Sequence, residues 1–427
     1  MIRRLDGQNP LACAGLSLIV VCVFSAASFG QSPPVDTELV GQWDGFDGSY
    51  ADVWGNGDYA YIGSWGDSFV QIVDISDAAN PGPAVQYALP SGAQGSAQDV
   101  KVGDDLLFIG LGGGGSVGVH IVEVRDPGNP VGLVDIDIKG FNAIHNTFYD
   151  SGHLYLVDSG STRIGVVDLT TLDPDNPPAG AITELKWLLT DVGDSFVHDI
   201  TVQDGRMYAC AWDSGLWIYD VTNVATEPPS FMGQTPDGGN NTHSAWPTGN
   251  GDYVVTGEER FGGGIKVYRI SKVGQGLELE LTDTLELPTD QANSVHNQTV
   301  VGYRVYNSWY GHGLQVFDID PVTGLLEFVA SYDTSADGLG NWGVYPFLGS
   351  DKVLASDVSN GLFIINVDPA AGPSPDLDND GDVDAFDLAL LLGSWGPCSD
   401  CQDCPADLNG DCTVGAADLA FLLGNWG

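Results

Sequence analysis

Basic side chains are scarce in this sequence. Its 427 residues contain 14 Lys and Arg against 58 Asp and Glu, which gives a formal net charge of −44 at neutral pH. A surface this acidic repels the phosphates of nucleic acids and anionic lipid head groups. Nucleic acid is therefore excluded as an expected partner, whereas bound divalent cations are compatible with the composition.

Long apolar runs are missing after the first thirty residues, so no later segment is expected to span a bilayer. Residues 1–30 are typical of a secretory signal peptide: Arg3 and Arg4 are followed by an apolar run at 11–24 and by small residues at 25–30. A membrane anchor is the alternative, but the run is too short to span comfortably. We expect the leader to be cleaved near Gly30 and the protein to be secreted or held at the cell surface.

Cysteine is sparse and unevenly placed. Of seven cysteines, two lie in the predicted leader and Cys210 lies in an apolar strand. The other four cluster near the end of the chain, at Cys398, Cys401, Cys404 and Cys412. In an exported protein such a cluster favours two disulfides, for which three pairings exist, and a zinc site made from the same four is the alternative.

Glycine, in contrast, is abundant at 58 residues, and one strand pattern recurs seven times. The copy at 215–221, Gly-Leu-Trp-Ile-Tyr-Asp-Val, alternates apolar residues with others and has a polar residue near its end. That polar position recurs at Asp74, Glu123, Asp168, Asp220, Arg269, Asp318 and Asn366. The intervals, by subtraction, are 49, 45, 52, 49, 49 and 48 residues. Seven near-equal units indicate a repeat architecture.

Four short strands fit into each unit, which is the content of one propeller blade. We therefore predict an all-β fold over 38–368, a seven-bladed β-propeller of four-stranded blades. The seventh unit lacks a fourth strand, and an orphan strand at 38–43 precedes the first unit. Pairing 38–43 with the last blade would close the ring and protect an open sheet edge.

The repeated strands, together with Thr-His-Ser-Ala-Trp-Pro at 242–247 and Gly-Gly-Gly-Ile-Lys-Val-Tyr at 262–268, resemble the LVIVD-repeat β-propellers of the choice-of-anchor B family of bacterial surface proteins. The resemblance spans roughly 38–368. It implies a propeller displayed through an exchangeable surface anchor, and it implies no particular activity.

A Pro/Gly/Ser/Ala-rich linker at 369–375 leads to a tail, 376–427, with two copies of a loop followed by an apolar helix pattern. Oxygen ligands around a sharply turning loop are what calcium requires. In the first loop Gly381 makes the turn, and the expected ligands are Asp376, Asp378, Asp380, Asp382 (by its backbone carbonyl), Asp384 and Asp387.

The second loop departs from that pattern. Cys412 stands where glycine would make the turn and Gly415 removes one ligand, so we expect weaker calcium binding there. Its expected ligands are Asp407, Asn409, Asp411, Thr413 and Asp418. The tail resembles a type I dockerin module of the Gly/Cys type, a small α-helical, EF-hand-like domain. That resemblance implies calcium as a cofactor and a cohesin-like or other cell-surface anchoring partner. A merely acidic disordered tail is the alternative, and it leaves the duplicated apolar helix unexplained.

Polar residues recur at the start of the innermost strands. These are Asp52 and Asp99 in blades one and two, then His145, His198, His243 and His296 in blades three to six. Around one axis, they are candidate ligands for a divalent transition metal, and Glu258 and Glu259, which follow the next strand of blade five, are placed to reach the rim. The alternative is that they hydrogen-bond between blades and to channel water. Four tryptophans near strand ends are candidates for stacking on sugars or for blade packing: Trp212, Trp246, Trp309 and Trp342.

Two functions remain open on these grounds. The first is a non-enzymatic binding or adhesion module that carries a protein or glycan ligand on the propeller and is anchored through the calcium-binding tail. The second is an exported metal-dependent hydrolase acting on a lactone, ester or polysaccharide through the channel histidines. Convergence of the histidines on one point would favour the second.

Overall fold

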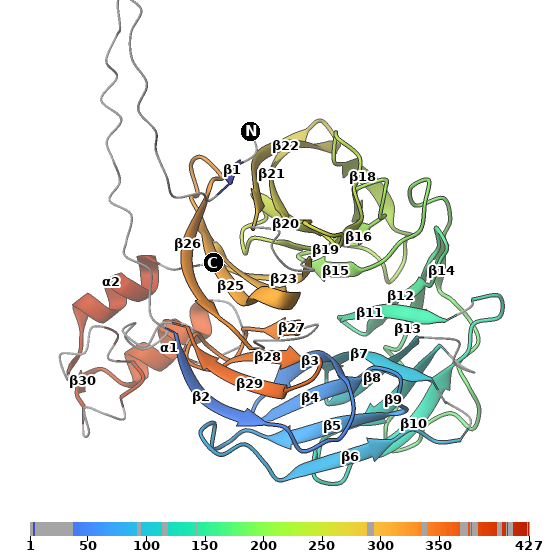
Figure 1. Ribbon diagram of the computed structural model, residues 1–427, viewed down its shortest axis with the longest axis horizontal. Coiled ribbons are helices and arrows are strands. Elements are labelled where there is room, and N and C mark those ends of the chain that lie inside the picture. The colour runs from blue at the N-terminus through green and yellow to red at the C-terminus, as the bar shows by residue number, and fades with distance from the viewer. Residues whose placement is uncertain are drawn as a thin grey trace, which may run out of the picture.

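Seven sheets arranged around a common centre make up most of the molecule (Figure 1). The computed structural model describes residues 3–4, 37–91, 95–112, 118–141, 143–287, 294–334, 340–367, 375, 377, 383–398, 404–406, 408, 413–424 and 426. In Figure 1 the strands β3, β7, β11, β15, β19, β23 and β27 surround the centre, and the last strand of each sheet lies at the periphery. The predicted seven-bladed, all-β propeller is confirmed.

Each blade is an antiparallel sheet whose strands follow one another from the centre outward. Their bounds are, for blade one, β3 (Tyr50–Asn56), β4 (Tyr59–Ser64), β5 (Phe69–Asp74) and β6 (Ala84–Ala88); for blade two, β7 (Ser96–Gly103), β8 (Leu106–Gly112), β9 (Val119–Glu123) and β10 (Val131–Ile136); for blade three, β11 (Ile144–Asp150), β12 (His153–Asp158), β13 (Ile164–Asp168) and β14 (Trp187–Leu189); for blade four, β15 (Ile200–Gln203), β16 (Arg206–Cys210), β17 (Leu216–Asp220) and β18 (Ser230–Gln234).

The remaining three blades follow the same plan. Blade five consists of β19 (Thr242–Pro247), β20 (Tyr253–Glu258), β21 (Ile265–Val273) and β22 (Gly276–Glu286); blade six of β23 (Val295–Val301), β24 (Arg304–Trp309), β25 (Gly313–Ile319) and β26 (Leu326–Tyr332); blade seven of β27 (Asn341–Tyr345), β28 (Val353–Asp357), β29 (Gly361–Asn366) and β2 (Glu38–Trp43). A short 3-10 helix, η1 (Tyr310–His312), joins β24 and β25, the second and third strands of blade six.

The ring closes through the two ends of the propeller chain. β2 pairs antiparallel with β29, with Glu38 opposite Asn366 and Trp43 opposite Leu362, and Figure 1 shows the two strands side by side. The innermost strand of blade seven also contacts that of blade one. The closure expected for 38–43 is therefore present, and it covers the edge of β29, whose backbone groups would otherwise be unpaired.

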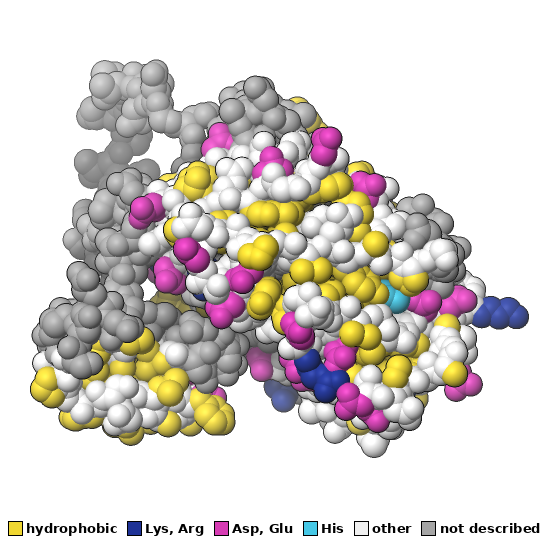
Figure 2. Space-filling view, turned by 90° about the horizontal axis from the view of Figure 1, so that it is seen from below, with side chains coloured by type: hydrophobic (Ala, Val, Ile, Leu, Met, Phe, Trp, Pro, Cys, Tyr) yellow, Lys and Arg dark blue, Asp and Glu magenta, His cyan; other side chains and the backbone are white. Residues whose placement is uncertain are grey.

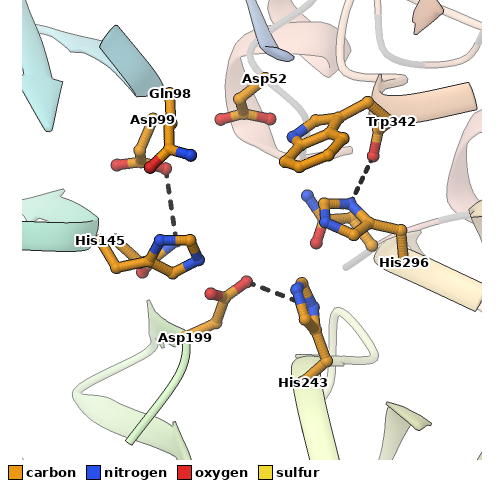
Figure 3. Close-up of a pocket in the computed structure, with 10 residues that line it drawn as sticks. Asp52, Gln98, Asp99, His145, Asp199, His243, His296 and Trp342 are labelled. Carbon is orange, nitrogen blue, oxygen red and sulfur yellow. Dashed lines mark hydrogen bonds and ion pairs between the residues drawn. The ribbon is translucent and has the colours of Figure 1, made fainter. Parts of the chain in front are cut away.

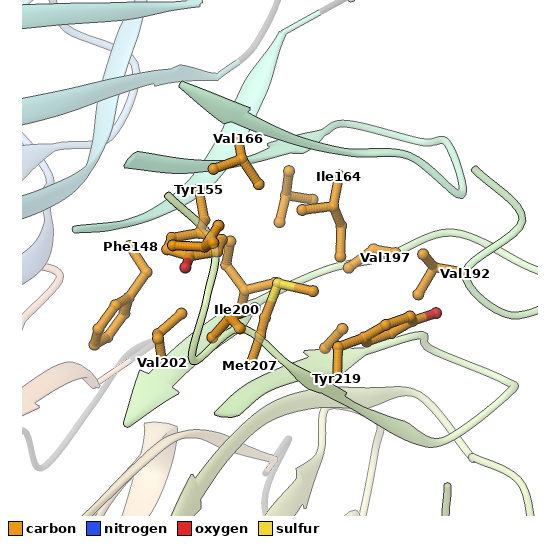
Figure 4. Close-up of a cluster of buried hydrophobic side chains, with 14 of the residues drawn as sticks. Phe148, Tyr155, Ile164, Val166, Val192, Val197, Ile200, Val202, Met207 and Tyr219 are labelled. Atoms are coloured by element: carbon orange, nitrogen blue, oxygen red, sulfur yellow. The ribbon is translucent and has the colours of Figure 1, made fainter. Parts of the chain in front are cut away.

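Apolar side chains fill the spaces between neighbouring blades. In the cluster between blades three and four, Tyr155 and Val166 from one sheet face Ile200 and Met207 from the next, and all four are buried (Figure 4). Both faces of a middle strand are covered in this way. The repeated strands therefore contain nearly continuous apolar runs, and the blades hold one another in place.

Only Arg3 and Arg4 of the predicted leader are described. They form β1 (Arg3–Arg4), which pairs in parallel with β22 on the outer edge of blade five. β22 is an outer strand, and the backbone groups on its outer edge are those that pair with β1. Within the described ranges, no helix has the length and apolar character needed to cross a membrane.

Two nine-residue helices, α1 (Ala385–Gly393) and α2 (Ala416–Gly424), pack against each other in the tail. The short strands β30 (Gly396–Pro397) and β31 (Thr413–Val414) pair beside them. A disulfide joins Cys398 to Cys404, which removes two thiolates from the alternative zinc set. Cys401 and Cys412 lie outside the described residues.

Candidate functional site

An irregularity at the start of the innermost strands turns polar side chains toward the axis. The register with the second strand shifts near this end in six blades, for example between Ile144 and Thr147 and between Thr242 and Ser244. In blade four, His198 and Asp199 both lie opposite Cys210, whose carbonyl and amide bond one residue each. A bulge of this kind lets consecutive residues point to the same side of a strand.

A small pocket of about 20 Å³ lies at this end of the axis. Its lining is mostly polar: Asp52, Gln98, Asp99, His145, Asn146, Asp199, His243, His296, Asn297 and Trp342. Figure 3 shows these side chains around an open centre, with the Asp199 carboxylate among the histidines. Five of the six predicted channel residues line the pocket, and His198 lies against two of them.

The four histidines form a continuous row across blades three to six. Ring centroids are 4.3 Å apart between His145 and His198, 4.0 Å between His198 and His243, and 4.4 Å between His243 and His296. Nδ1 of His296 donates a 2.6 Å hydrogen bond to the Trp342 carbonyl, so the proton of this neutral ring is on Nδ1. The four histidine side chains are therefore brought next to one another in a row, and the last of them is also bonded to a backbone carbonyl.

Two carboxylates interleave with the histidines. Asp199 Oδ1 lies 2.9 Å from His198 Nδ1, and Asp199 Oδ2 lies 3.8 Å from His243 Nδ1. Glu259 Oε2 lies 3.5 Å from His243 Nε2. Among the described residues, two groupings have ligand atoms within 4.8 Å of one another: one is His145, His198 and Asp199, and the other is His198, His243 and Glu259. Each is a two-histidine, one-carboxylate set, which suits a divalent transition metal.

Asp52 and Asp99 belong to a different network. Lys101 Nζ lies 2.7 Å from Asp52 Oδ2 and 2.5 Å from Asp99 Oδ1, and it lies over the Trp54 ring. Asp99 Oδ2 also accepts hydrogen bonds from the amide and hydroxyl of Thr147. These two predicted ligands therefore line the pocket, but the structure pairs them with a lysine and leaves them out of both histidine groupings.

Burial controls the protonation of the site. It lowers the pKa of His145 to about 4, with His198 adding repulsion, and lowers the pKa of His198 to about 4. The pKa of His243 falls well below its usual value, first through burial and then through the neighbouring histidines. Burial raises the pKa of Asp199 to about 7. At neutral pH the imidazoles are uncharged and keep a nitrogen lone pair each.

In the network of Lys101, Asp52 and Asp99, burial and the attraction between opposite charges act in opposite directions on the pKa values of Asp52 and Lys101. Burial raises the pKa of Asp52 to about 6, although the charge of Lys101 opposes the shift. Burial alone would lower the pKa of Lys101, but the two carboxylates outweigh it and the pKa rises. A charged lysine therefore holds the start of blade two against blade one.

Aromatic side chains lie in the lining of the pocket and beside it. Trp342 lines it, and the half-exposed Trp65 lies 4.9 Å from Trp342 between ring centroids. On the other side, Trp212 stacks on His198 at 5.0 Å with φ at +45°, a conformation that bulky residues rarely adopt. Of the four tryptophans singled out by the sequence, Trp212 and Trp342 reach the site. In contrast, Trp246 and Trp309 pack in the apolar cores.

Asp199, Lys101, Gln98, Asn146 and Asn297 were not predicted as site residues. Regular alternation along a strand would place Asp199 on the face opposite His198, and the bulge overrides this. A usable signal was present in the sequence, because a polar residue follows the histidine in each of these four repeats: His145-Asn146, His198-Asp199, His243-Ser244 and His296-Asn297.

Four of the predicted calcium ligands in the tail can be placed. Asp387 is buried at the start of α1 and accepts hydrogen bonds from the amides of Leu377 and Asp384, while Asp384 caps the helix through the Phe386 amide. Asp418 is buried in the equivalent position of α2 and accepts from the Gly415 amide, and Thr413 lies in β31. The other predicted ligands lie outside the described residues: Asp376, Asp378, Asp380, Asp382, Asp407, Asn409 and Asp411.

Comparisons with known proteins support the fold. The LVIVD repeat model matches residues 47–88, a stretch that contains all of blade one. Two solved structures cover most of the chain: the WD40 repeats of RRP9 (10% identity, TM-score 0.55, 79% of this chain and 99% of that chain) and U3-55K (11% identity, TM-score 0.55, 78% and 99%). No curated protein sequence matches. The chain is thus similar to LVIVD-repeat proteins in its first blade and to the RRP9 WD40 repeats and U3-55K in its fold.

Proposed function

We propose that this protein is an exported binding module that binds a glycan over the axial pocket of its propeller, against Trp65 and Trp342. The observation that carries the proposal is the combination of a polar pocket lined by Trp342 with the partly exposed Trp65, whose ring packs against Trp342. Aromatic rings pack against the apolar faces of sugar rings, while side-chain amides such as those of Gln98 and Asn297 donate hydrogen bonds to hydroxyls and accept hydrogen bonds from them. Trp65 is 46% exposed, so its ring is accessible to a ligand.

The tail serves as the attachment in this proposal. Each tail helix buries one leucine, Leu391 or Leu422, and leaves a leucine and a tryptophan of the same repeat exposed. The exposed pairs are Leu392 with Trp395 and Leu423 with Trp426, at 46–51% exposure. A duplicated apolar surface fits docking to a cohesin-like or other cell-surface partner, and bound calcium would order the loops that precede the helices.

Glycan binding is tested by titrating the full-length protein with a panel of soluble polysaccharides and oligosaccharides. We expect the double variant Trp65→Ala/Trp342→Ala to lose at least tenfold in affinity for a binding glycan. Phe231→Ala is the matched control, because Phe231 is an exposed aromatic residue on the peripheral strand β18 of blade four. Equal affinity in the double variant, or binding of a protein ligand only, would contradict the glycan assignment.

Attachment is tested separately by cell-surface pull-down of the full chain in calcium and in chelator. We expect Trp395→Ala/Trp426→Ala to abolish retention while the propeller remains folded, and we expect chelation to have the same effect. Retention that survives both changes would show that the tail is not the anchor.

A metal-dependent hydrolase is the second candidate. The observation in its favour is the pair of two-histidine, one-carboxylate groupings at the axis, a ligand type found in hydrolytic metal sites. Incubating the full chain and a divalent metal with aryl esters, lactones and polysaccharides decides between the two. Turnover lost in His243→Asn would establish the enzyme, and binding without turnover would support the module.

A further inference from the structure

We infer that His198, His243 and Glu259 bind one divalent transition-metal ion of the zinc class. The three side chains come from the starts of the innermost strands of blades four and five and from the loop after β20. Their ligand atoms all lie within 4.8 Å of one another. The site is independent of the proposed glycan binding, which rests on the aromatic pair.

The spacing of the ligand atoms fits a shared ion. His243 Nε2 and Glu259 Oε2 are 3.5 Å apart, too far for a strong hydrogen bond. Two ligands at about 2.1 Å from a tetrahedral zinc ion are separated by about 3.4 Å. The existing separation of these two atoms therefore needs little adjustment to accommodate a metal.

His243 supplies a second, independent observation. Its side chain is only 2% exposed, and its Nδ1 has no hydrogen-bond partner among the described residues. A buried polar atom without a partner is costly. With a metal on Nε2, the ring would carry its proton on Nδ1, where Asp199 Oδ2 at 3.8 Å is the nearby carboxylate acceptor. A metal on Nε2 would thus fix the tautomer in which the buried Nδ1–H faces the Asp199 carboxylate.

Neighbouring groups orient the other two ligands. Asp199 Oδ1 engages His198 Nδ1 at 2.9 Å, which leaves Nε2 for the metal, and Trp212 stacks on the same ring. The Tyr310 hydroxyl donates a 2.7 Å hydrogen bond to Glu259 Oε1, which leaves Oε2 facing His243. Outer partners of this kind commonly orient histidine and carboxylate ligands. The strained backbone of Trp212 is consistent with a functional constraint at this point.

Two imidazoles and one carboxylate leave one coordination position for a water molecule or a ligand in the pocket. This donor set suits zinc and neighbouring divalent ions better than calcium, which prefers oxygen ligands only. His145 belongs to the alternative grouping with His198 and Asp199. In our assignment Asp199 orients His198 instead of binding the metal, and His145 is not a ligand.

The test is titration of the full-length protein with Zn²⁺, and with Co²⁺ as a spectroscopic probe, in saturating calcium that occupies the acidic tail. We expect one equivalent to bind, with a visible Co²⁺ absorption band typical of low coordination. Glu259→Gln and His243→Asn should each weaken Zn²⁺ binding at least tenfold. His312→Asn, which removes a histidine outside the cluster, should not.

Absence of stoichiometric binding, or undiminished binding in both ligand variants, would overturn the assignment. Binding that is lost in His145→Asn and kept in Glu259→Gln would also overturn it, because the ion would then occupy the alternative grouping. Should a variant fail to fold by circular dichroism, X-ray absorption of the zinc-loaded wild-type protein decides. Two nitrogen ligands and at least one oxygen ligand at about 2.0–2.1 Å, with the same shell retained in His145→Asn, support the site, and a shell of oxygens alone refutes it.

Discussion

Lys101 places its ammonium nitrogen 2.7 Å from a carboxylate oxygen of Asp52, across the boundary between blades one and two. Both side chains are about nine-tenths buried, and Asp99 approaches the same nitrogen. The charges on this side of the channel therefore balance one another within the protein. On the opposite side no lysine or arginine is paired with Asp199 or Glu259 among the described ion pairs. That contrast distinguishes the histidine side as the candidate ligand site.

Replacing Lys101 by methionine should destabilise the propeller by about 3–5 kcal/mol, because two buried carboxylates lose their shared cation. Urea unfolding of the full-length protein measures the change. Lys139→Met, at an exposed position before blade three, is the matched control and should lie within about 0.5 kcal/mol of wild type. A similar loss in both variants would contradict a specific role for the buried network.

Gly41 tests the closure of the ring. It lies in β2, and a Cβ there would approach the Ala78 carbonyl oxygen to 2.1 Å. Gly41→Val should therefore cost about 1–3 kcal/mol and lower the thermal midpoint, because the closing strand must shift away from blade one. Gly180→Val introduces the same side chain where the structure leaves open space. A midpoint lowered equally by both substitutions would argue against tight packing of β2.

Acid should destabilise the metal-free protein through its buried histidines. His145 has a pKa of about 4 when folded and 6.5 as its ordinary value. Between these limits the unfolded state binds more protons, so the contribution of His145 makes stability fall as the pH falls from 6.5 to 4. The raised pKa values of Asp199 and Asp52 make stability rise as the pH falls, which opposes the effect of His145. The contribution of His145 is therefore isolated by comparing a His145 variant with wild type at each pH.

In the presence of chelator, wild type should lose as much as about 3 kcal/mol of its free energy of unfolding through His145 as the pH falls from 6.5 to 4, and His145→Asn should not show this loss. Urea midpoints measured at several values between pH 4 and 7 give the difference in slope. Parallel curves for the two proteins would show that His145 does not carry the predicted shift.

Cys210 should resist alkylation while the propeller is folded. Its side chain is buried on β16, and burial raises the pKa of its thiol well above the usual value. Because the thiolate is the reactive form, both effects slow modification. Mass spectrometry of the Cys210 peptide after iodoacetamide treatment should show labelling in urea and little labelling in native buffer. Rapid native labelling would mean that blade four opens readily.

Blade number and strand order could be predicted from the sequence because each blade must satisfy the same physical demand. A four-stranded sheet buries both faces against its neighbours, so every repeat carries the same apolar pattern, and seven copies at 45–52 residues define seven blades. Even the pairing of Glu38–Trp43 with the last blade followed from a missing fourth strand, since an unpaired edge is unfavourable.

The site was predictable only in part. Repetition marked the histidines, because the same strand position recurs in successive blades and the propeller brings those positions to one axis. It did not separate Asp52 and Asp99, which pair with Lys101, from Asp199 and Glu259, which meet the histidines. Pairing of this kind depends on side-chain directions within a few ångströms, and a strand pattern does not contain that information.

The sequence by itself thus determined the repeat, the ring and the row of histidines, since these depend on apolar periodicity and on equal spacing. Only the tertiary structure decided which carboxylates contact those histidines. The bulge at His198 and Asp199 reverses the regular alternation of the strand, and Glu259 reaches His243 from a loop held by the Tyr310 hydroxyl of the next blade. Both effects arise from packing between blades, where local pattern no longer determines which atoms meet.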